Sequence, residues 1–259
     1  MPDPKIIEAF ANAATTYDTY ADVQVLAASR LAAFLEANTR DLVPGSILEV
    51  GCGTGIFTQR LLDLFSNRDF RITDLCPQML EQCQSRLTAA PRDNRVTFDV
   101  QDANAPADYF GTHALITAAF ALQWVDQIEH CLKELVDQLS EGGKLFFSLP
   151  AEGSFAEWKT TCQKAGVPYT GNPLPQPDVF REFATANGLR LSLYEESFRV
   201  SHKSLHAFLQ SLKSLGAHTS THSAHLSVTE LRRLLSFAEA AFPTHFDVTY
   251  RVLFGHFTR

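Results

Sequence analysis

The sequence predicts an α/β fold in which a mostly parallel, seven-stranded sheet carries helices on both faces. Two observations lead to this prediction. Short β-rich runs alternate with helical patterns through the first 150 residues, and a glycine-rich turn joins the first strand to the helix that follows it. Strands separated by single helices form right-handed crossovers, and therefore a parallel sheet. A chain of 259 residues, 45% of them hydrophobic, is long enough to bury the core of such a fold.

Five predicted strands make up the centre of the sheet, each a short run rich in apolar or β-branched residues. They span residues 46–51, 70–73, 95–100, 113–118 and 144–149. The helices between them are predicted at residues 56–65, 77–87 and 126–139. Pro77 falls near the start of its helix, where a missing N–H costs least. Gly142 and Gly143 are expected to stop the helix that precedes them.

Further elements precede and follow this centre. Two helices are predicted ahead of it, at residues 6–16 and 23–38. After residue 150 the regular alternation lapses, and residues 151–187 are compatible with short helices. The remaining predictions are strands at residues 189–200 and 246–257 and helices at residues 204–215 and 227–241. Ser227 and Glu230 have the spacing of a capping box at the start of the last helix.

Composition excludes several classes of protein. The formal net charge of −7 argues against a protein that binds nucleic acid through its overall field. The charge is uneven: residues 1–150 hold 11 Lys/Arg and 20 Asp/Glu (11 − 20 = −9), whereas residues 151–259 hold 11 and 9 (11 − 9 = +2). No apolar run reaches the roughly 18 residues that cross a membrane, and no signal peptide is evident. Five cysteines without CxxC spacing predict free thiols and a cytoplasmic protein.

The strongest functional signal is the glycine-rich turn, where Gly51, Gly53 and Gly55 follow Glu49. Glycines at the end of a buried strand let the backbone turn sharply and approach a ligand closely. The spacing is GxGxG, whereas a dinucleotide fingerprint is GxGxxG, and Ile56 stands in place of its third glycine. Glu49 suits the ammonium end of a ligand better than a phosphate. The turn therefore indicates a ligand other than a pyrophosphate.

Two carboxylates follow the second and third strands. Asp74 lies 19 residues after Gly55 and can accept both hydroxyls of a ribose, as in sites for NAD and for S-adenosylmethionine. Asp102 can accept a hydrogen bond from an adenine amino group. The alternatives are that Asp74 caps the next helix and that Asp102 is simply solvated. Because ligands bind beyond the carboxyl ends of parallel strands, we expect the turn and both carboxylates to converge on one site.

Several stretches resemble known families. Five segments resemble the core of class I, Rossmann-like methyltransferases. They are ILEVGCGTG at residues 47–55, TDLCPQML at 73–80, VQDA at 100–103, ALQWV at 121–125 and LKELVDQLSEGGKLFFSL at 132–149. Other segments resemble the malonyl-acyl-carrier-protein O-methyltransferases of biotin synthesis. These are the pattern AFxxAAxxYDxxA from Ala9 to Ala21, FALQW at 120–124 and SLKSLGA at 211–217. The resemblance spans nearly the whole chain.

The resemblance implies S-adenosylmethionine as the cofactor and no metal. The cofactor-binding residues are then expected to be Glu49, Gly51, Cys52, Gly53, Gly55, Asp74, Leu75, Asp102 and Ala103. It also implies lid helices in residues 1–44, a cofactor-binding core in residues 45–150, and the rest of the sheet with inserted substrate-cap helices in residues 151–259. Five histidines between residues 202 and 225 are interpreted as part of a solvated loop.

The activity that the resemblance implies is methylation of the free carboxylate of a malonyl thioester on acyl carrier protein or coenzyme A. A carboxylate is ionised at neutral pH, so we expect no general base. Tyr17 is expected in a lid over the methyl-donor end and Trp124 in the pocket wall, with Lys213 as the cation that pairs with the malonyl carboxylate. The acidic carrier protein is expected to dock on the more positive C-terminal part, which holds Lys159, Lys164, Arg181, Arg190 and Lys203.

Three other functions remain open at this point. The same core also serves methyltransferases that act on a small free carboxylic acid or another metabolite. A protein that binds S-adenosylmethionine without catalysis has the same cofactor motifs. A nicotinamide dehydrogenase is disfavoured by Ile56, which replaces the third glycine of the dinucleotide fingerprint.

Overall fold

The computed structural model describes residues 4–87, 94–105, 112–218 and 225–259. Its centre is a seven-stranded sheet with the order β3-β2-β1-β4-β5-β7-β6. The strands are β1 (Ser46–Val50), β2 (Asp69–Asp74), β3 (Arg95–Val100), β4 (His113–Ala119), β5 (Leu139–Pro150), β6 (Arg190–His202) and β7 (Phe246–Thr258). Strands β1 to β5 pair in parallel, and β7 pairs antiparallel with both β5 and β6. The predicted α/β fold is confirmed.

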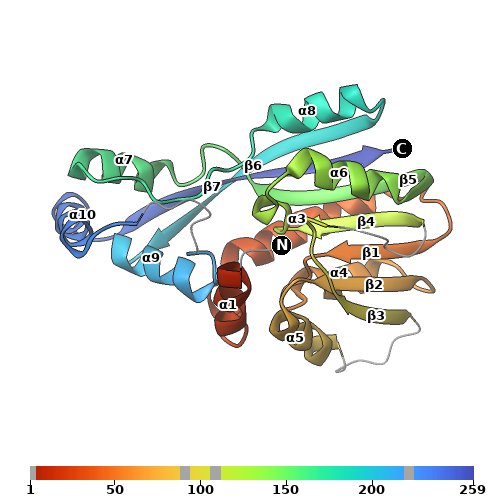
Figure 1. Cartoon of the computed structure of the whole chain (residues 1–259), viewed down its shortest axis with the longest axis horizontal. Helices are drawn as coiled ribbons and strands as arrows, with labels where there is room; N and C mark the ends of the chain where they lie inside the picture. The colour runs from red at the N-terminus through yellow and green to blue at the C-terminus, as the bar shows by residue number, and fades with distance from the viewer. Residues whose placement is uncertain (1–3, 88–93, 106–111, 219–224) are drawn as a thin grey trace.

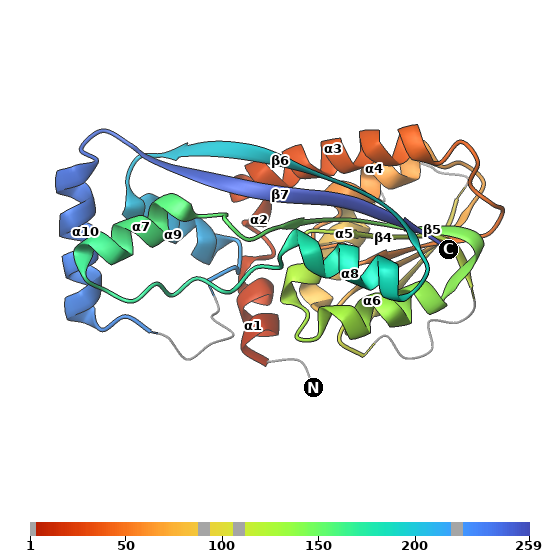
Figure 2. The same ribbon diagram turned by 90° about the horizontal axis from the view of Figure 1, so that it is seen from above.

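Helices cover both faces of this sheet, as Figures 1 and 2 show. They are α1 (Pro4–Ala13), α2 (Tyr17–Tyr20), α3 (Asp22–Asn38), α4 (Ile56–Leu64), α5 (Pro77–Leu87), α6 (Ile128–Asp137), α7 (Ala156–Ala165), α8 (Pro177–Ala186), α9 (Leu205–Ser214) and α10 (Val228–Ala241), with a 3-10 turn η1 (Leu122–Trp124). Leu31 of α3 and Leu61 of α4 join Ile47 of β1 in one apolar core. Leu132 of α6 joins the next residue of β1, Leu48, in a second core. Successive side chains of a strand point to opposite faces, so the two cores lie on opposite sides of the sheet.

Burial along the strands follows their place in the sheet. In β4 every residue but Ala119 is buried, because helices cover both faces of a central parallel strand. Strand β6 lies at the edge of the sheet, and most of its positions are exposed or half-buried. The sequence pattern of each strand therefore reports how many of its faces are covered.

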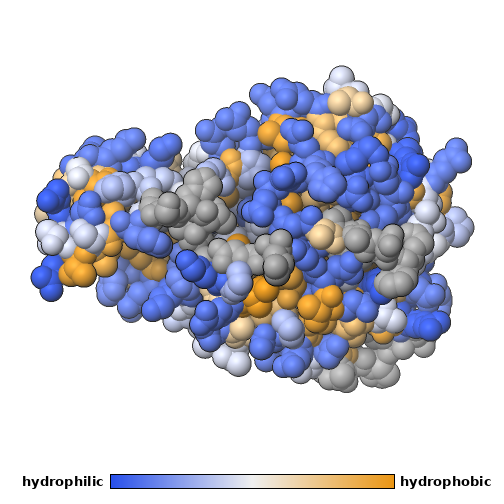
Figure 3. Space-filling model, in the orientation of Figure 1, coloured by the Kyte–Doolittle hydropathy of each residue, from blue (hydrophilic) through white to orange (hydrophobic). Residues whose placement is uncertain are grey.

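The antiparallel pair of β6 and β7 extends past the rest of the sheet. Strand β5 pairs with β7 only from Val252 to Thr258, whereas β6 pairs with β7 along its whole length. Helices α7, α9 and α10 gather at the projecting end of this pair and form what we call the cap (Figure 1). The cap packs on an aromatic cluster of Phe155, Trp158, Tyr169, Phe208, Phe246 and Tyr250. Figure 3 shows a largely hydrophilic face with apolar residues gathered at the cap end.

Helices α1 and α2 form a lid between the sheet and the cap (Figure 2). Helix α1 contacts α5 and α9, and α2 also contacts α9. The chain after α9 comes close to α1 at Gly216, which has a φ of +70°. A Cβ atom there would lie 3.0 Å from both the carbonyl oxygen of Ala9 and Cδ1 of Phe10. The lid is therefore in contact with both the core and the cap.

Two predicted elements differ from the structure. The helix predicted at residues 6–16 ends at Ala13, and a turn in which the Thr16 N–H donates to the Ala13 carbonyl leads into α2. The helix predicted at residues 126–139 ends at Asp137, and β5 begins at Leu139 rather than at residue 144. Leu139 pairs with His113 of β4, so sheet pairing starts before the glycines that were expected to stop the helix. The capping box at the start of α10 is present as predicted.

Candidate active site

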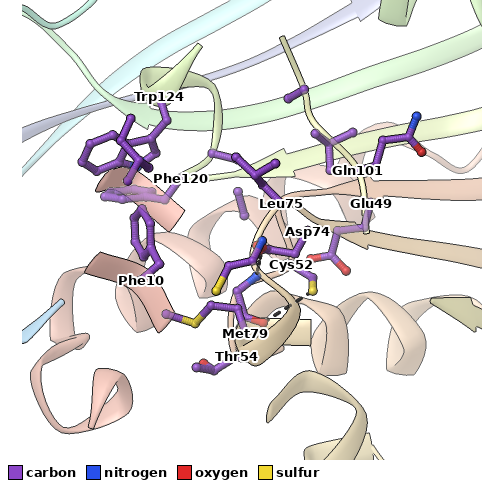
Figure 4. Close-up of a pocket in the computed structure, with 18 of the residues that line it drawn as sticks. Phe10, Glu49, Cys52, Thr54, Asp74, Leu75, Met79, Gln101, Phe120 and Trp124 are labelled. Atoms are coloured by element: carbon purple, nitrogen blue, oxygen red, sulfur yellow. Dashed lines mark hydrogen bonds between the residues drawn. The ribbon is translucent and has the colours of Figure 1, made fainter. Parts of the chain in front are cut away.

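A pocket opens at the carboxyl ends of β1, β2, β3 and β4 (Figure 4). The turns after these strands form one side, and residues of α1, α2, α3 and η1 form the other. The predicted site residues that line it are Tyr17, Glu49, Gly51, Cys52, Gly53, Asp74, Leu75, Asp102, Ala103 and Trp124. Gly55 and Lys213 are not among the lining residues. The structure therefore brings the three strand-end motifs together with the lid.

The glycine-rich turn is held in a shape that only glycine adopts freely. Gly51 and Gly53 have φ values of +71° and +54°, in the left-handed region. A Cβ atom on Gly51 would lie 2.4 Å from Cβ of Ala121, whereas one on Gly53 would meet nothing within 4 Å. The N–H groups of Gly51 and Cys52 both donate to the carbonyl of Thr73 at 2.9 Å. Gly51 thus allows close packing, and Gly53 leaves bare backbone facing the pocket.

Asp74 joins the glycine-rich turn to the end of β2. Its Oδ2 accepts a hydrogen bond from the N–H of Gly53, and its Oδ1 accepts one from the N–H of Cys76, both at 2.8 Å. Burial raises the pKa of Asp74, while these backbone donors act in the opposite direction. A carboxylate offers about four acceptor positions, so each oxygen keeps a lone pair for a further donor. Asp74 is therefore both a structural tie and an acceptor that faces the pocket.

Glu49 is a fully buried carboxylate next to this turn. Neither of its oxygens makes a close hydrogen bond to a described residue. Burial raises its pKa well above the usual range, Cys83 and Asp74 add to this effect, and the side chain of Thr58 opposes it only in part. A buried acid without a close partner costs free energy unless something compensates it. The ammonium group of a ligand, bound directly or through water, meets that need.

Gly55 packs directly against helix α5. It lies at the start of α4 with a φ of +86°, and a Cβ atom there would meet Sγ of Cys83, which α5 carries, at 2.9 Å. Gly55 therefore shapes the turn through helix packing, and its contact with the cofactor stays a prediction.

The turn after β3 is fixed by Asn104, which sequence reasoning missed. Asp102 Oδ1 accepts hydrogen bonds from the N–H of Asn104 at 2.9 Å and from its Nδ2 at 3.1 Å. Asn104 Oδ1 in turn accepts from the N–H of Asp126 at 2.8 Å. The Asp-x-Asn spacing of an Asx turn was the available signal. Asp102 is thus oriented at the pocket with one oxygen already engaged, and its contact with an adenine remains a prediction.

Aromatic residues from the lid and from the end of β4 form the opposite wall. Phe10 of α1 and Trp124 of η1 meet edge to face, with ring centroids 5.3 Å apart (Figure 4). Phe120 also lines the pocket and has a φ of +54°, which is uncommon for a bulky residue and typical of functional sites. Gln123 Nε2 donates to the Phe120 carbonyl at 2.6 Å. Nothing in the sequence signals this backbone conformation, because phenylalanine rarely adopts it.

Tyr17 enters the pocket from the lid helix α2. Burial raises its pKa far above the usual range, and the charges of Asp74 and Asp18 raise it further. The Gln24 side chain hydrogen-bonds to it and partly offsets that rise. A phenol with so high a pKa stays protonated, so Tyr17 is a neutral donor at every pH at which the protein works.

Lys213 lies on an exposed part of α9, outside the pocket lining. The sequence predicts that it pairs with the malonyl carboxylate, and among the described residues no hydrogen bond or ion pair joins it to the pocket. The positive charges expected to dock a carrier protein divide between two regions. Lys159 and Lys164 belong to α7 of the cap, and Lys203 precedes α9, whereas Arg181 and Arg190 lie on α8 and at the start of β6.

Other candidate chemistry is limited. The five cysteines are free and buried, as predicted, and Cys52 and Cys83 lie close enough for their thiols to interact. No cluster of three metal-ligating side chains occurs among the described residues. In the histidine-rich stretch, His222 lies outside the residues that the structure describes. None of the described helices combines the length and apolarity that a membrane span requires.

The donor set fits S-adenosylmethionine. The cofactor carries an ammonium group, a ribose and an adenine, and the pocket offers Glu49, Asp74 and Asp102 at three successive strand ends. Gly53 adds a stretch of bare backbone beside Asp74, where a Cβ atom would meet nothing. A pyrophosphate, by contrast, would meet the buried carboxylate of Glu49.

Comparison with known proteins places the chain. Residues 47–143 match the profile of a methyltransferase domain. The chain is 32% identical over 214 residues to the malonyl-[acyl-carrier protein] O-methyltransferase of Magnetococcus marinus, an alignment that covers 82% of this chain and 77% of that protein. It is 30% identical to the biotin biosynthesis bifunctional protein BioCD of Bordetella avium, over 100% of this chain and 53% of that protein. Among solved structures, N-methyltransferase NodS of Bradyrhizobium japonicum, in complex with S-adenosyl-L-homocysteine, superposes with a TM-score of 0.54, at 15% identity and 99% coverage of both chains.

The fold, the strand-end pocket and the matching domain define a methyltransferase of the class I type. The alignment with the Magnetococcus protein extends well beyond residues 47–143. The chain belongs to the family of malonyl-[acyl-carrier protein] O-methyltransferases.

Proposed function

We propose that this protein transfers a methyl group from S-adenosylmethionine to the free carboxylate of a malonyl thioester on acyl carrier protein. The observation that carries the proposal is the similarity to malonyl-[acyl-carrier protein] O-methyltransferases over 82% of the chain. The product is a methyl ester, which masks the charge of the malonyl group. In keeping with the Bordetella relative, we place the reaction in biotin biosynthesis.

The pocket suits a reaction that needs no general base. When bound, S-adenosylmethionine supplies an electrophilic methyl group on a sulfonium sulfur. A carboxylic acid is already ionised at neutral pH, so no side chain has to remove a proton. The residues of the chain therefore bind, orient and exclude water. Glu49 holds the ammonium group and Asp74 the ribose hydroxyls, and their rigid backbone contacts fix the position of the cofactor.

The lid supplies the dry environment that favours this chemistry. Opposite charges are neutralised as a carboxylate takes a methyl group from a sulfonium, so the reaction gains from a site closed to water. Tyr17 and Trp124 close the pocket over the methyl-donor end. Tyr17 is a neutral donor, so its hydroxyl can orient an oxygen of the substrate carboxylate. A cation paired with the same carboxylate would lower the nucleophilicity of that oxygen more strongly.

The charge of the cap suits an anionic partner, and the name of the Magnetococcus relative leads us to propose acyl carrier protein. Exposed positions of α7 and of the segment before α9 carry the cationic side chains of Lys159, Lys164 and Lys203. Carrier proteins are acidic, so the charges are complementary. We also propose that the protein works in the cytoplasm, because its five cysteines are free thiols.

The test compares substrates in one assay. Purified protein is incubated with S-adenosylmethionine and either malonyl-acyl carrier protein, malonyl-CoA, malonate or trans-aconitate, and the methyl ester is detected by mass spectrometry. The proposal expects malonyl-acyl carrier protein to have the highest kcat/KM, and the Asp74→Ala variant to give no ester with any substrate. Faster turnover of a free dicarboxylate would replace the proposal by the small-acid alternative. An independent check is to introduce this gene into a strain that lacks the methylation step. The proposal expects the gene to restore growth on medium without biotin.

A further inference from the structure

The lid helix α2 has one residue packed on the protein and three that face solvent. Tyr17 at its start lines the pocket and packs on the small apolar cluster of Ala14, Cys76 and Met79. The other three residues are exposed, and the N-terminus of the helix has no side-chain cap. Apolar packing therefore holds only the first residue of this short helix, and the polar contacts of its neighbour add to it.

Asp18 supplies those polar contacts. Its Oδ1 accepts a hydrogen bond of 2.6 Å from the hydroxyl of Thr54, and its Oδ2 is paired with Nη2 of Arg86. Nε of Arg86 donates to the carbonyl of Thr54 at 2.7 Å. The three residues therefore form a closed ring, in which one guanidinium contacts both the lid and the glycine-rich turn.

Each member of this ring sits on a different part of the site. Asp18 belongs to the lid, next to Tyr17. Thr54 lies between the second and third glycines of the turn and is 3% exposed. Arg86 lies in the last turn of α5, where the helix dipole favours a positive charge. The ring thus links the position of the lid to the conformation of the turn.

We propose that Asp18, Thr54 and Arg86 form a latch that positions Tyr17 over the methyl-donor end and slows the release of the cofactor. The latch rests on one part of the proposed function, namely that S-adenosylmethionine binds in this pocket. Asp18 and Arg86 act as positioning residues, since Tyr17 is the group that faces the pocket.

The latch is open to solvent, so its strength should depend on the salt concentration. The side chains of Asp18 and Arg86 are 51% and 28% exposed. An exposed ion pair is screened by salt, whereas apolar packing is not. Cofactor release should therefore accelerate with ionic strength, and this dependence should disappear when the pair is removed.

The experiment is a double-mutant cycle on release of S-adenosylhomocysteine. Release is followed by stopped-flow tryptophan fluorescence, because Trp124 lines the pocket. Asp18→Asn and Arg86→Gln should each raise the release rate about two- to fivefold, the effect expected from losing a solvent-exposed ion pair. The double variant should be no faster than the Arg86 variant, since both substitutions remove the same contact. Arg86→Lys should fall between, because lysine cannot contact the carboxylate and the carbonyl with one planar group.

Lys133→Gln is the matched control. It removes an exposed ion pair, with Asp137, on α6 outside the pocket lining. Its release rate should equal that of the unmodified protein at every salt concentration. Thermal unfolding of each variant shows that the protein remains folded.

Two results overturn the latch: single variants that release the ligand at the unmodified rate, or a double variant whose effect is the sum of the two. The measurement needs no acyl substrate. A protein that shows the coupling yet methylates no malonyl thioester would keep the latch and lose the proposed function. A protein that methylates the thioester but shows no coupling between the two substitutions would keep the proposed function and lose the latch.

Discussion

Asp74 has two roles, and replacing it tests both. In Asp74→Asn one carboxylate oxygen becomes an amide nitrogen, which cannot accept from the N–H of Gly53 or that of Cys76. A hydrogen bond to a charged group contributes about 1.5–3 kcal/mol. Burial raises the pKa of Asp74, so removal of the buried charge offsets part of this loss. We expect the free energy of unfolding to fall by about 1–2 kcal/mol.

The cofactor should be affected more strongly than the fold. Loss of a charge-assisted contact with the ribose should weaken binding by about 10- to 100-fold. Urea unfolding measures the first effect and titration calorimetry with S-adenosylmethionine the second. Asp69→Asn is the matched control, because Asp69 is exposed at the other end of the same strand. An unchanged Kd in the Asp74 variant, with the protein still folded, would refute the assignment of the ribose to this carboxylate.

Three further predictions concern other site residues. Burial raises the pKa of Glu49 in the folded protein, so the stability of the unliganded protein should fall as pH rises through that raised value. Glu49→Gln should therefore raise Tm at pH 8 while weakening S-adenosylmethionine binding by about tenfold or more; a lower Tm together with unchanged binding would contradict this. Tyr17→Phe should reduce kcat by more than it raises the Kd of the cofactor. In the unmodified protein, the pH profile of kcat should show no titration of Tyr17 near pH 10, the ordinary pKa of tyrosine, because burial raises the pKa of this residue. Lys213→Gln should leave the KM for the acyl substrate within about twofold, as expected for a solvated surface charge; a large increase would support the role predicted from the sequence.

The sheet and the strand-end motifs were predictable because local patterns determine them. A buried strand, a glycine-rich turn and a helix are adjacent in the chain, and the rule that ligands bind at strand ends then brings Glu49, Asp74 and Asp102 together. The start of β5 was not predictable in this way. Leu139 belongs to the sheet because it pairs with His113, a contact distant in sequence that outweighs the glycine stop signal.

The side-chain roles that the sequence missed also depend on distant contacts. Arg86 lies on α5 and meets Asp18 of the lid, 68 residues earlier in the chain. The GxGxG spacing placed Gly55 with the ligand, and it does not show that this glycine also packs on Cys83 of α5. Lys213 was chosen from a resembling segment, and such a segment does not show in which direction a side chain points. Sequence patterns therefore located the cofactor edge of the site better than the acyl side.

The most direct test of the whole account is a crystal structure of the protein with S-adenosylhomocysteine. We predict that both ribose hydroxyls contact Asp74, that the amino group approaches Glu49 directly or through one water, and that the adenine lies beside Asp102. A nucleoside bound elsewhere, or bound in this pocket with its ribose away from Asp74, would contradict the account.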